Sequence, residues 1–206
     1  MGATDEFLRA IGEAILPDSK QSISDWAQDN RILPPDSPEP GAWRNSRTPY
    51  LVGIMDALSP SSKYREVYLK KGHQLGGSAL GENFIGHSIT SAAGNILAVF
   101  ATVEDAEKWE LSRFEPMRES TKALRRRVLD AGINGADNTK RRKKFPGGFI
   151  QLIGANRPGG LKSSTMRYVL LEEMDEYAGD IGNQGSPEEL ARKRTSNFGR
   201  KARIFG

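Results

Sequence analysis

Apolar residues along the chain alternate between helical and strand-like spacing. In residues 4–33 they recur three and four positions apart, with a break at Pro17 and Asp18, which predicts two short helices. The segment 33–43 then holds four prolines and a glycine. This composition excludes a helix and predicts extended or turn conformations in a connecting strap.

From residue 48 onward, strand-like and helical patterns follow one another. Thr48 and Pro49 are typical of a helix start, and apolar residues follow them on one face. Further helices are expected from about residue 78 and over residues 103–120, and strands over residues 65–70, 96–101, 149–154 and 168–172. This alternation favours a three-layer α/β domain with a mostly parallel sheet, in which ligands bind at the carboxyl ends of the strands.

Composition narrows the classes of function. The chain has no cysteine and only two histidines, His73 and His87, which excludes thiolate metal sites and makes a zinc enzyme a poor hypothesis. No apolar run approaches the roughly 20 residues of a membrane span, and we expect a cytoplasmic setting without membrane contact. Residues 1–40 carry an excess of acids and residues 41–206 an excess of bases, so the body of the chain is compatible with a polyanionic partner.

A glycine-rich loop, KGHQLGGS, follows the first predicted strand at residues 71–78. In the usual P-loop, G-x-x-x-x-G-K-[ST], backbone N–H groups surround the phosphates, lysine neutralises their charge and the hydroxyl binds Mg²⁺. Here Gly76 and Ser78 fit, but Gly77 takes the place of the lysine and Lys71 stands at the first position. A lysine at the start of a tight loop can still reach the β- and γ-phosphates, and the following helix presents its N-terminus to them. The same residues are equally typical of an ordinary turn after a strand.

An apolar run that ends in two carboxylates, YVLLEE at residues 168–173, supplies the complementary motif. In-line attack on a γ-phosphate needs one acid on the metal and one beside the attacking water, so Glu172 is expected to bind Mg²⁺ and Glu173 to act as the base. The usual first acid is Asp, and Glu172 carries its carboxylate one methylene further out. The alternative is a strand that runs into an acidic, solvated turn.

Several separated blocks occur in an order and spacing that can be compared with a known family. They are RTPY at 47–50 followed by IMDAL, the KGHQLGGS loop with ENFIG, Ala101 and Thr102 at a strand end, GAN at 154–156, LLEEMDEY at 170–177 and GSPEELARKRT at 185–195. In these blocks the chain, from about Trp26 onward, resembles the large terminase subunits of lambda-like tailed phages. These are the ATPases that drive viral DNA into preformed capsids.

The resemblance implies both a fold and a set of site residues. The implied fold is a three-layer P-loop (ASCE-type) nucleotide hydrolase domain over residues 46–206, after a helical arm and strap over residues 1–45. In that family the basic residue stands at the start of the phosphate loop, which would make Lys71 the functional lysine. The implied cofactors are ATP and Mg²⁺, with Lys71 and Glu173 as catalytic residues and Ser78 and Glu172 as metal ligands. The implied nucleotide-binding residues are Tyr50 (stacked on adenine), Lys71, Gly72, His73, Gln74, Leu75, Gly76, Gly77 and Ser78.

The resemblance also implies partners. We expect double-stranded DNA, the terminase small subunit and the capsid portal, engaged by a homo-oligomeric ring at the procapsid in the host cytoplasm. The family's proteins continue into a coupling motif and a nuclease domain, and this chain resembles only the preceding region, so we expect a C-terminally truncated ATPase region without nuclease activity. A non-catalytic DNA-binding or assembly protein of the same fold and a helicase-like ATPase are the alternatives.

Two groups of cations are candidates for phosphate contact. Arg125, Arg126 and Arg127 form one, and the run KRRKK at residues 140–144 forms the other. A solvated charged loop explains the second group equally well. The candidates for an arginine or lysine that acts in trans on a neighbouring subunit's nucleotide are Arg157, Lys162 and Arg167.

Overall fold

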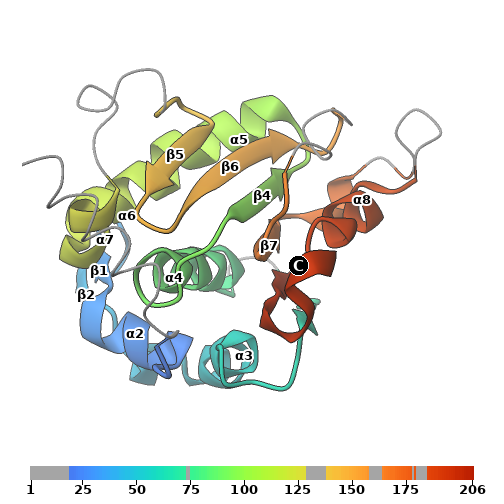
Figure 1. Ribbon diagram of the computed structural model, residues 1–206. Helices are drawn as coiled ribbons and strands as arrows, with labels where there is room; N and C mark the ends of the chain where they lie inside the picture. Colours follow the sequence, from blue (N-terminus) through green and yellow to red (C-terminus); the bar gives the residue numbers. More distant parts are fainter. Residues whose placement is uncertain (1–18, 73–74, 129–137, 158–163, 178, 180–184) are drawn as a thin grey trace, which may run out of the picture.

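The chain folds around one six-stranded sheet (Figure 1), in a computed structural model that describes residues 19–72, 75–128, 138–157, 164–177, 179 and 185–206. In sheet order the strands are β3 (Glu66–Val67), β8 (Arg203–Phe205), β7 (Tyr168–Leu171), β4 (Ile96–Phe100), β6 (Gly148–Gly154) and β5 (Arg142–Phe145). Every neighbouring pair is parallel except β5 and β6. The predicted α/β fold with a mostly parallel sheet is confirmed.

Both faces of the sheet are buried, which explains why its central strands are continuously apolar. On β4, Ile96, Ala98 and Phe100 belong to a larger core on one face, whereas Leu97 and Val99 belong to a smaller core on the other. The larger core is covered by α2 (Ile23–Asn30), α3 (Pro49–Leu58), α4 (Gly77–Thr90), α5 (Val103–Trp109) and α7 (Lys122–Arg127), and the smaller by α8 (Pro187–Lys193). In Figure 1, α5 runs alongside β6 and α8 lies next to β7. The predicted three layers are therefore present.

Helix α4 is buried almost along its whole length, because α2 and α3 pack on the side that faces away from the sheet. The closest approach is at Gly86, where an added Cβ would lie 2.2 Å from Cη2 of Trp26 in α2. Helix α2 therefore packs directly against the backbone of α4. Trp26 and Trp43 belong to the same larger core as α4. The division of the chain into an arm with strap, residues 1–45, and a domain, residues 46–206, stays a prediction.

The helix predicted over residues 103–120 is confirmed, with an interruption that the sequence did not indicate. Helix α5 passes into a π-helical turn, Glu110–Phe114, before continuing as α6 (Glu115–Ser120). In a regular α-helix, side chains five positions apart, such as those of Trp109 and Phe114, point in directions that differ by well over 100°. The wider turn brings Trp109 and Phe114 together in the larger core, with ring centroids 6.0 Å apart.

Several elements differ from the expectation or were not foreseen. Residues 142–145, for which a solvated charged loop was one alternative, form the edge strand β5, in which Lys143 and Phe145 point inward. The strap contains no helix, as predicted: residues 35–39 turn and bend, between the strands of the short antiparallel pair β1 (Ile32–Leu33) and β2 (Gly41–Ala42). Helices α7 and α8 and the 3₁₀ turns η1 (Asn45–Arg47), η4 (Met174–Glu176) and η5 (Ser196–Lys201) were also unforeseen. The first predicted helix lies outside the described residues. Among the helices that are described, none is both long and apolar enough to cross a bilayer.

Candidate functional site

The glycine-rich loop lies at the carboxyl end of β3 and opens directly into α4. Gly76 is the N-cap of α4 and has a φ of 77°, a left-handed conformation that favours glycine. An added Cβ at Gly76 would also lie 3.0 Å from Cδ1 of Leu51. The tight turn directs the unsatisfied N–H groups of the first turn of α4 toward the loop, as phosphate binding requires. His73 and Gln74 lie outside the described residues.

The side chain of Lys71 folds back over Gly77. An added Cβ at Gly77 would lie 1.9 Å from Cε and 3.1 Å from Nζ of Lys71. The backbone of Gly77 is helical, so glycine is required here for space and not for its conformational freedom. Lys71 thus reaches the first residue of α4, close to the position from which the lysine of a usual P-loop would start. This placement accounts for the glycine that the standard pattern would reject.

Ser78 joins the loop to the acidic strand end, because its hydroxyl donates a 2.7 Å hydrogen bond to Oε1 of Glu172 at the end of β7. Burial raises the pKa of the Glu172 carboxyl. The hydrogen bond from Ser78 opposes this shift, the charge of Glu173 adds to it, and the charges of Lys71 and Arg113 also oppose it. Lys71, Ser78 and Glu172 therefore lie in one electrostatic environment.

Glu173 follows in an unusual backbone conformation. Its φ and ψ are both 54°, and it is the one residue other than glycine with a positive φ in the described part of the chain. This conformation costs a non-glycine residue on the order of 1–2 kcal/mol. The side chain is exposed, in contrast to that of Glu172. The turn therefore directs two successive carboxylates into different surroundings, as two different tasks would require.

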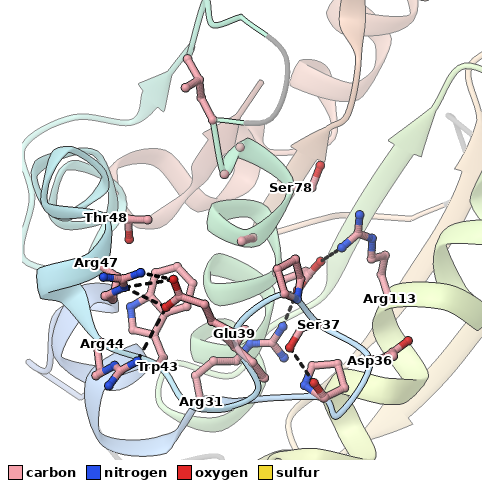
Figure 2. Close-up of a pocket in the computed structure, with 18 of the residues that line it drawn as sticks. Arg31, Asp36, Ser37, Glu39, Trp43, Arg44, Arg47, Thr48, Ser78 and Arg113 are labelled. Atoms are coloured by element: carbon pink, nitrogen blue, oxygen red, sulfur yellow. Dashed lines mark hydrogen bonds and ion pairs between the residues drawn. The ribbon is translucent and has the colours of Figure 1, made fainter.

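A cavity of about 760 Å³ lies beside the loop (Figure 2), within the size range of pockets for small ligands. Its walls come from the strap, the start of α3, the loop and the π-helical turn. The lining includes Leu33, Pro34, Trp43, Arg44, Arg47, Thr48, Lys71, Leu75, Gly76, Gly77, Ser78, Glu82 and Arg113. Tyr50 does not line the cavity and is 55% exposed, and its role in stacking on adenine stays a prediction. Trp43 is the aromatic residue of the strap that lines the cavity.

A charged cluster at the cavity was missed by the sequence reasoning. Arg31 and Glu82 form a buried salt bridge, and Nη1 of Arg113 lies 4.0 Å from Oε1 of Glu82. Burial raises the pKa of Glu82, and the charges of Arg31 and Arg113 oppose that shift. One signal was available, since Glu82 stands four residues after Ser78 and so lies on the same face of the predicted helix.

The donor set at the strand end suits Mg²⁺. Among the described residues, no three His, Cys, Asp or Glu side chains gather as a ready-made metal cage. Mg²⁺ at phosphate sites typically uses one or two carboxylates, a hydroxyl, substrate oxygens and water, and does not need such a cage. The adjacent oxygens of Ser78 and Glu172 fit that chemistry.

Comparison with known proteins decides the family. Residues 37–206 match the family model described as "Phage terminase large subunit gpA, ATPase domain". The chain belongs to this family. The family predicted from the sequence is thereby confirmed, while the roles of individual residues stay predictions.

A solved structure supports the fold of this terminase family member. The large terminase ATPase domain of Thermus phage P74-26 is 18% identical with a TM-score of 0.50, covering 73% of this chain and 62% of that one. A mutant form of the same phage domain is 17% identical with a TM-score of 0.49, covering 72% and 61%. The chain thus spans less than two thirds of the solved domain's length, and no curated protein matches it.

The cations proposed to contact DNA or a neighbouring nucleotide are not equivalent in this terminase chain. Lys143 is buried and pairs with Glu110 at 2.7 Å and Glu115 at 3.0 Å, so it holds β5 to the helix beneath it. Lys140, Arg141, Arg142 and Lys144 are exposed. Arg167 is buried and donates to the carbonyl of Ala93 at 3.2 Å, which argues against a role in trans. Arg157 is exposed, and Lys162 lies outside the described residues.

Proposed function

We propose that this chain binds and hydrolyses ATP in the presence of Mg²⁺, as the motor portion of a phage terminase large subunit that packages double-stranded DNA into the procapsid. The observation that carries the proposal is the meeting of Lys71, Ser78 and Glu172 at one end of the sheet. These residues come from two motifs more than ninety positions apart in the sequence. Motifs so far apart in the sequence come close together only because the fold places them at the same end of the sheet.

The residues divide the chemistry between them. Lys71 and the first N–H groups of α4 would hold the β- and γ-phosphates, because both present positive charge at the loop. Glu173 would accept a proton from the attacking water, since it is exposed and follows the buried acid directly. The strap would cover the rest of the nucleotide and exclude water from its wall of the cavity.

Ser78 and Glu172 would hold the metal ion. When bound, Mg²⁺ neutralises the charge that develops on the phosphates. The raised pKa of Glu172 is consistent with a buried carboxylate whose charge a bound cation would stabilise.

The wider role follows from the family and is proposed on that basis. Double-stranded DNA, the terminase small subunit and the capsid portal would be the partners, and the motor would work as a ring of identical subunits at the procapsid in the host cytoplasm. The exposed cations of β5 and of the turn before it offer a surface for sequence-independent phosphate contact.

Release of inorganic phosphate from Mg-ATP by the full chain tests the enzymatic proposal. Lys71→Ala and Glu173→Gln should each lower the rate at least tenfold, whereas Glu176→Gln, an exposed acid in the same turn, should leave it unchanged. Equal rates in all four proteins would refute hydrolysis at this site and favour a non-catalytic protein of the same fold. DNA unwinding by the chain would favour the helicase-like alternative.

A further inference from the structure

Arg113 is a cavity-lining cation to which the phosphate-binding and acidic motifs assign no role. Its side chain is 59% exposed, and its closest carboxylate oxygen among the described residues is Oε1 of Glu82 at 4.0 Å, beyond hydrogen-bond distance. Figure 2 shows it across the pocket from Arg44 and Arg47. Of those two, Arg47 donates hydrogen bonds to both oxygens of Glu39. Within the described part of the chain, Arg113 has no such hydrogen-bonded acid.

The π-helical turn explains why Arg113 faces the cavity. The turn brings Phe114 beneath Trp109, and both rings are buried in the larger core. The residue just before Phe114 is thereby left beside the cavity with its charge exposed. Because π-helical turns are rare and cost favourable geometry, they are often retained where they position a functional side chain.

The partner of Arg113 holds it only weakly. Glu82 is buried and already bound by Arg31, while its Oε1 has no hydrogen-bond partner among the described residues. An ion pair at 4.0 Å that involves an exposed arginine contributes little, whereas a phosphate accepts two parallel hydrogen bonds from a guanidinium. A phosphate in the cavity would therefore draw Arg113 away from Glu82.

The position of Arg113 relative to the phosphate loop indicates which phosphate it would meet. Glu82 lies on α4 one turn beyond Ser78, so Arg113 approaches the helix whose N-terminus carries the phosphate loop. Arg113 lines the same cavity as Lys71 and Ser78, the loop residues proposed to hold the terminal phosphates and the metal ion. The nucleotide atoms nearest these loop residues would be those at the reacting end.

We propose that Arg113 contacts the terminal phosphate of a nucleoside triphosphate bound in its own chain, and so distinguishes triphosphate from diphosphate. This inference rests on the proposed function of the site. It differs from an arginine supplied in trans, because Arg113 lines the cavity of the chain that holds the loop. Release from Glu82 on binding would make the contact dependent on the third phosphate.

Binding of Mg-ADP and of a non-hydrolysable Mg-ATP analogue to the full chain tests the inference. Arg113→Ala should lower the affinity for the triphosphate analogue about tenfold or more and change the affinity for ADP less than about twofold. Arg113→Lys, which keeps the charge but loses the two-pronged contact, should fall between the wild type and Arg113→Ala. Arg44→Ala is the matched control, since Arg44 lines the same cavity and is similarly exposed, and it should leave the ratio of the two affinities unchanged.

The outcomes separate the two proposals. If the wild-type chain binds neither nucleotide, the proposed function is wrong and the role of Arg113 falls with it. If the wild type binds both nucleotides and Arg113→Ala keeps the wild-type ratio, the assignment of Arg113 is overturned while the proposed function stands. Thermal unfolding of each variant identifies any general loss of fold, which would weaken the binding of both nucleotides together. In that case the ratio of the two affinities in Arg113→Lys decides the assignment of Arg113.

Discussion

Substitution of Gly77 by alanine should separate nucleotide binding from stability. The new Cβ would occupy space now taken by Cε of Lys71, 1.9 Å away, so the lysine must leave the loop. Lys71 is exposed, so its displacement should cost the fold little. Alanine is also the better helix former by about 0.5–1 kcal/mol, so the free energy of unfolding should be unchanged or slightly higher.

The loss should appear in affinity. A hydrogen bond to a charged group contributes about 1.5–3 kcal/mol, which corresponds to roughly tenfold to 150-fold weaker binding of Mg-ATP when Lys71 cannot reach the phosphates. Titration of a fluorescent ATP analogue measures this loss, and Gly53→Ala is the matched control, because a Cβ on Gly53 in α3 meets no atom within 4 Å.

A double-mutant cycle makes the reasoning refutable. Because both changes remove the same contact, Gly77→Ala combined with Lys71→Ala should bind no more weakly than Lys71→Ala alone. Moving the lysine, by combining Lys71→Ala with Gly77→Lys, should restore part of the affinity by recreating the usual P-loop. Wild-type affinity in Gly77→Ala, or fully additive losses in the double variant, would show that Lys71 does not act through the space above Gly77.

The remaining predictions concern stability. Lys143→Met should lower the free energy of unfolding by about 3–5 kcal/mol in chemical denaturation, because two largely buried carboxylates lose their cation, whereas exposed Lys140→Met should change it by less than about 0.5 kcal/mol. Burial alone would raise the pKa of Glu115, but hydrogen bonds from its cationic neighbours hold it below its ordinary value of 4.5. Its stabilising effect is therefore complete above that pH and is lost as pH falls further, and this acid-side loss should be smaller in Lys143→Met. Gly86→Ala should cost about 1–3 kcal/mol, because its Cβ would lie 2.2 Å from the buried ring of Trp26; an unchanged melting temperature would contradict the close packing of these helices.

The sequence predicted those parts of the fold that depend on local pattern. The buried strand β4 and the helix that opens at Gly77 follow from continuous apolar runs and from glycine before a helical period. The edge strand β5 was missed because its residues are mostly charged. Lys143 faces inward only through its pairing with acids on another element, which periodicity cannot reveal.

The site was predictable as motifs but not as a complete pocket. Lys71, Ser78 and Glu172 could be named because each stands at a strand end or loop with a known chemical task. Arg113 could not be named, because its orientation depends on a π-helical turn set by the packing of two aromatic rings. The role of Tyr50 came only from the family resemblance; its side chain is exposed and does not line the cavity, so that role stays a prediction.

The order of the strands has a mechanical consequence for the site. The loop extends from β3 and the acids from β7, but β8 lies between these two strands, so they are separated by two strand spacings, about 10 Å. No side chain of β8 lines the cavity, yet β8 sets the spacing between the strand before the loop and the strand that ends in the acids. A change in the thickness or register of this spacer, for example at the buried Ile204, would alter the alignment of lysine and carboxylate without touching either one.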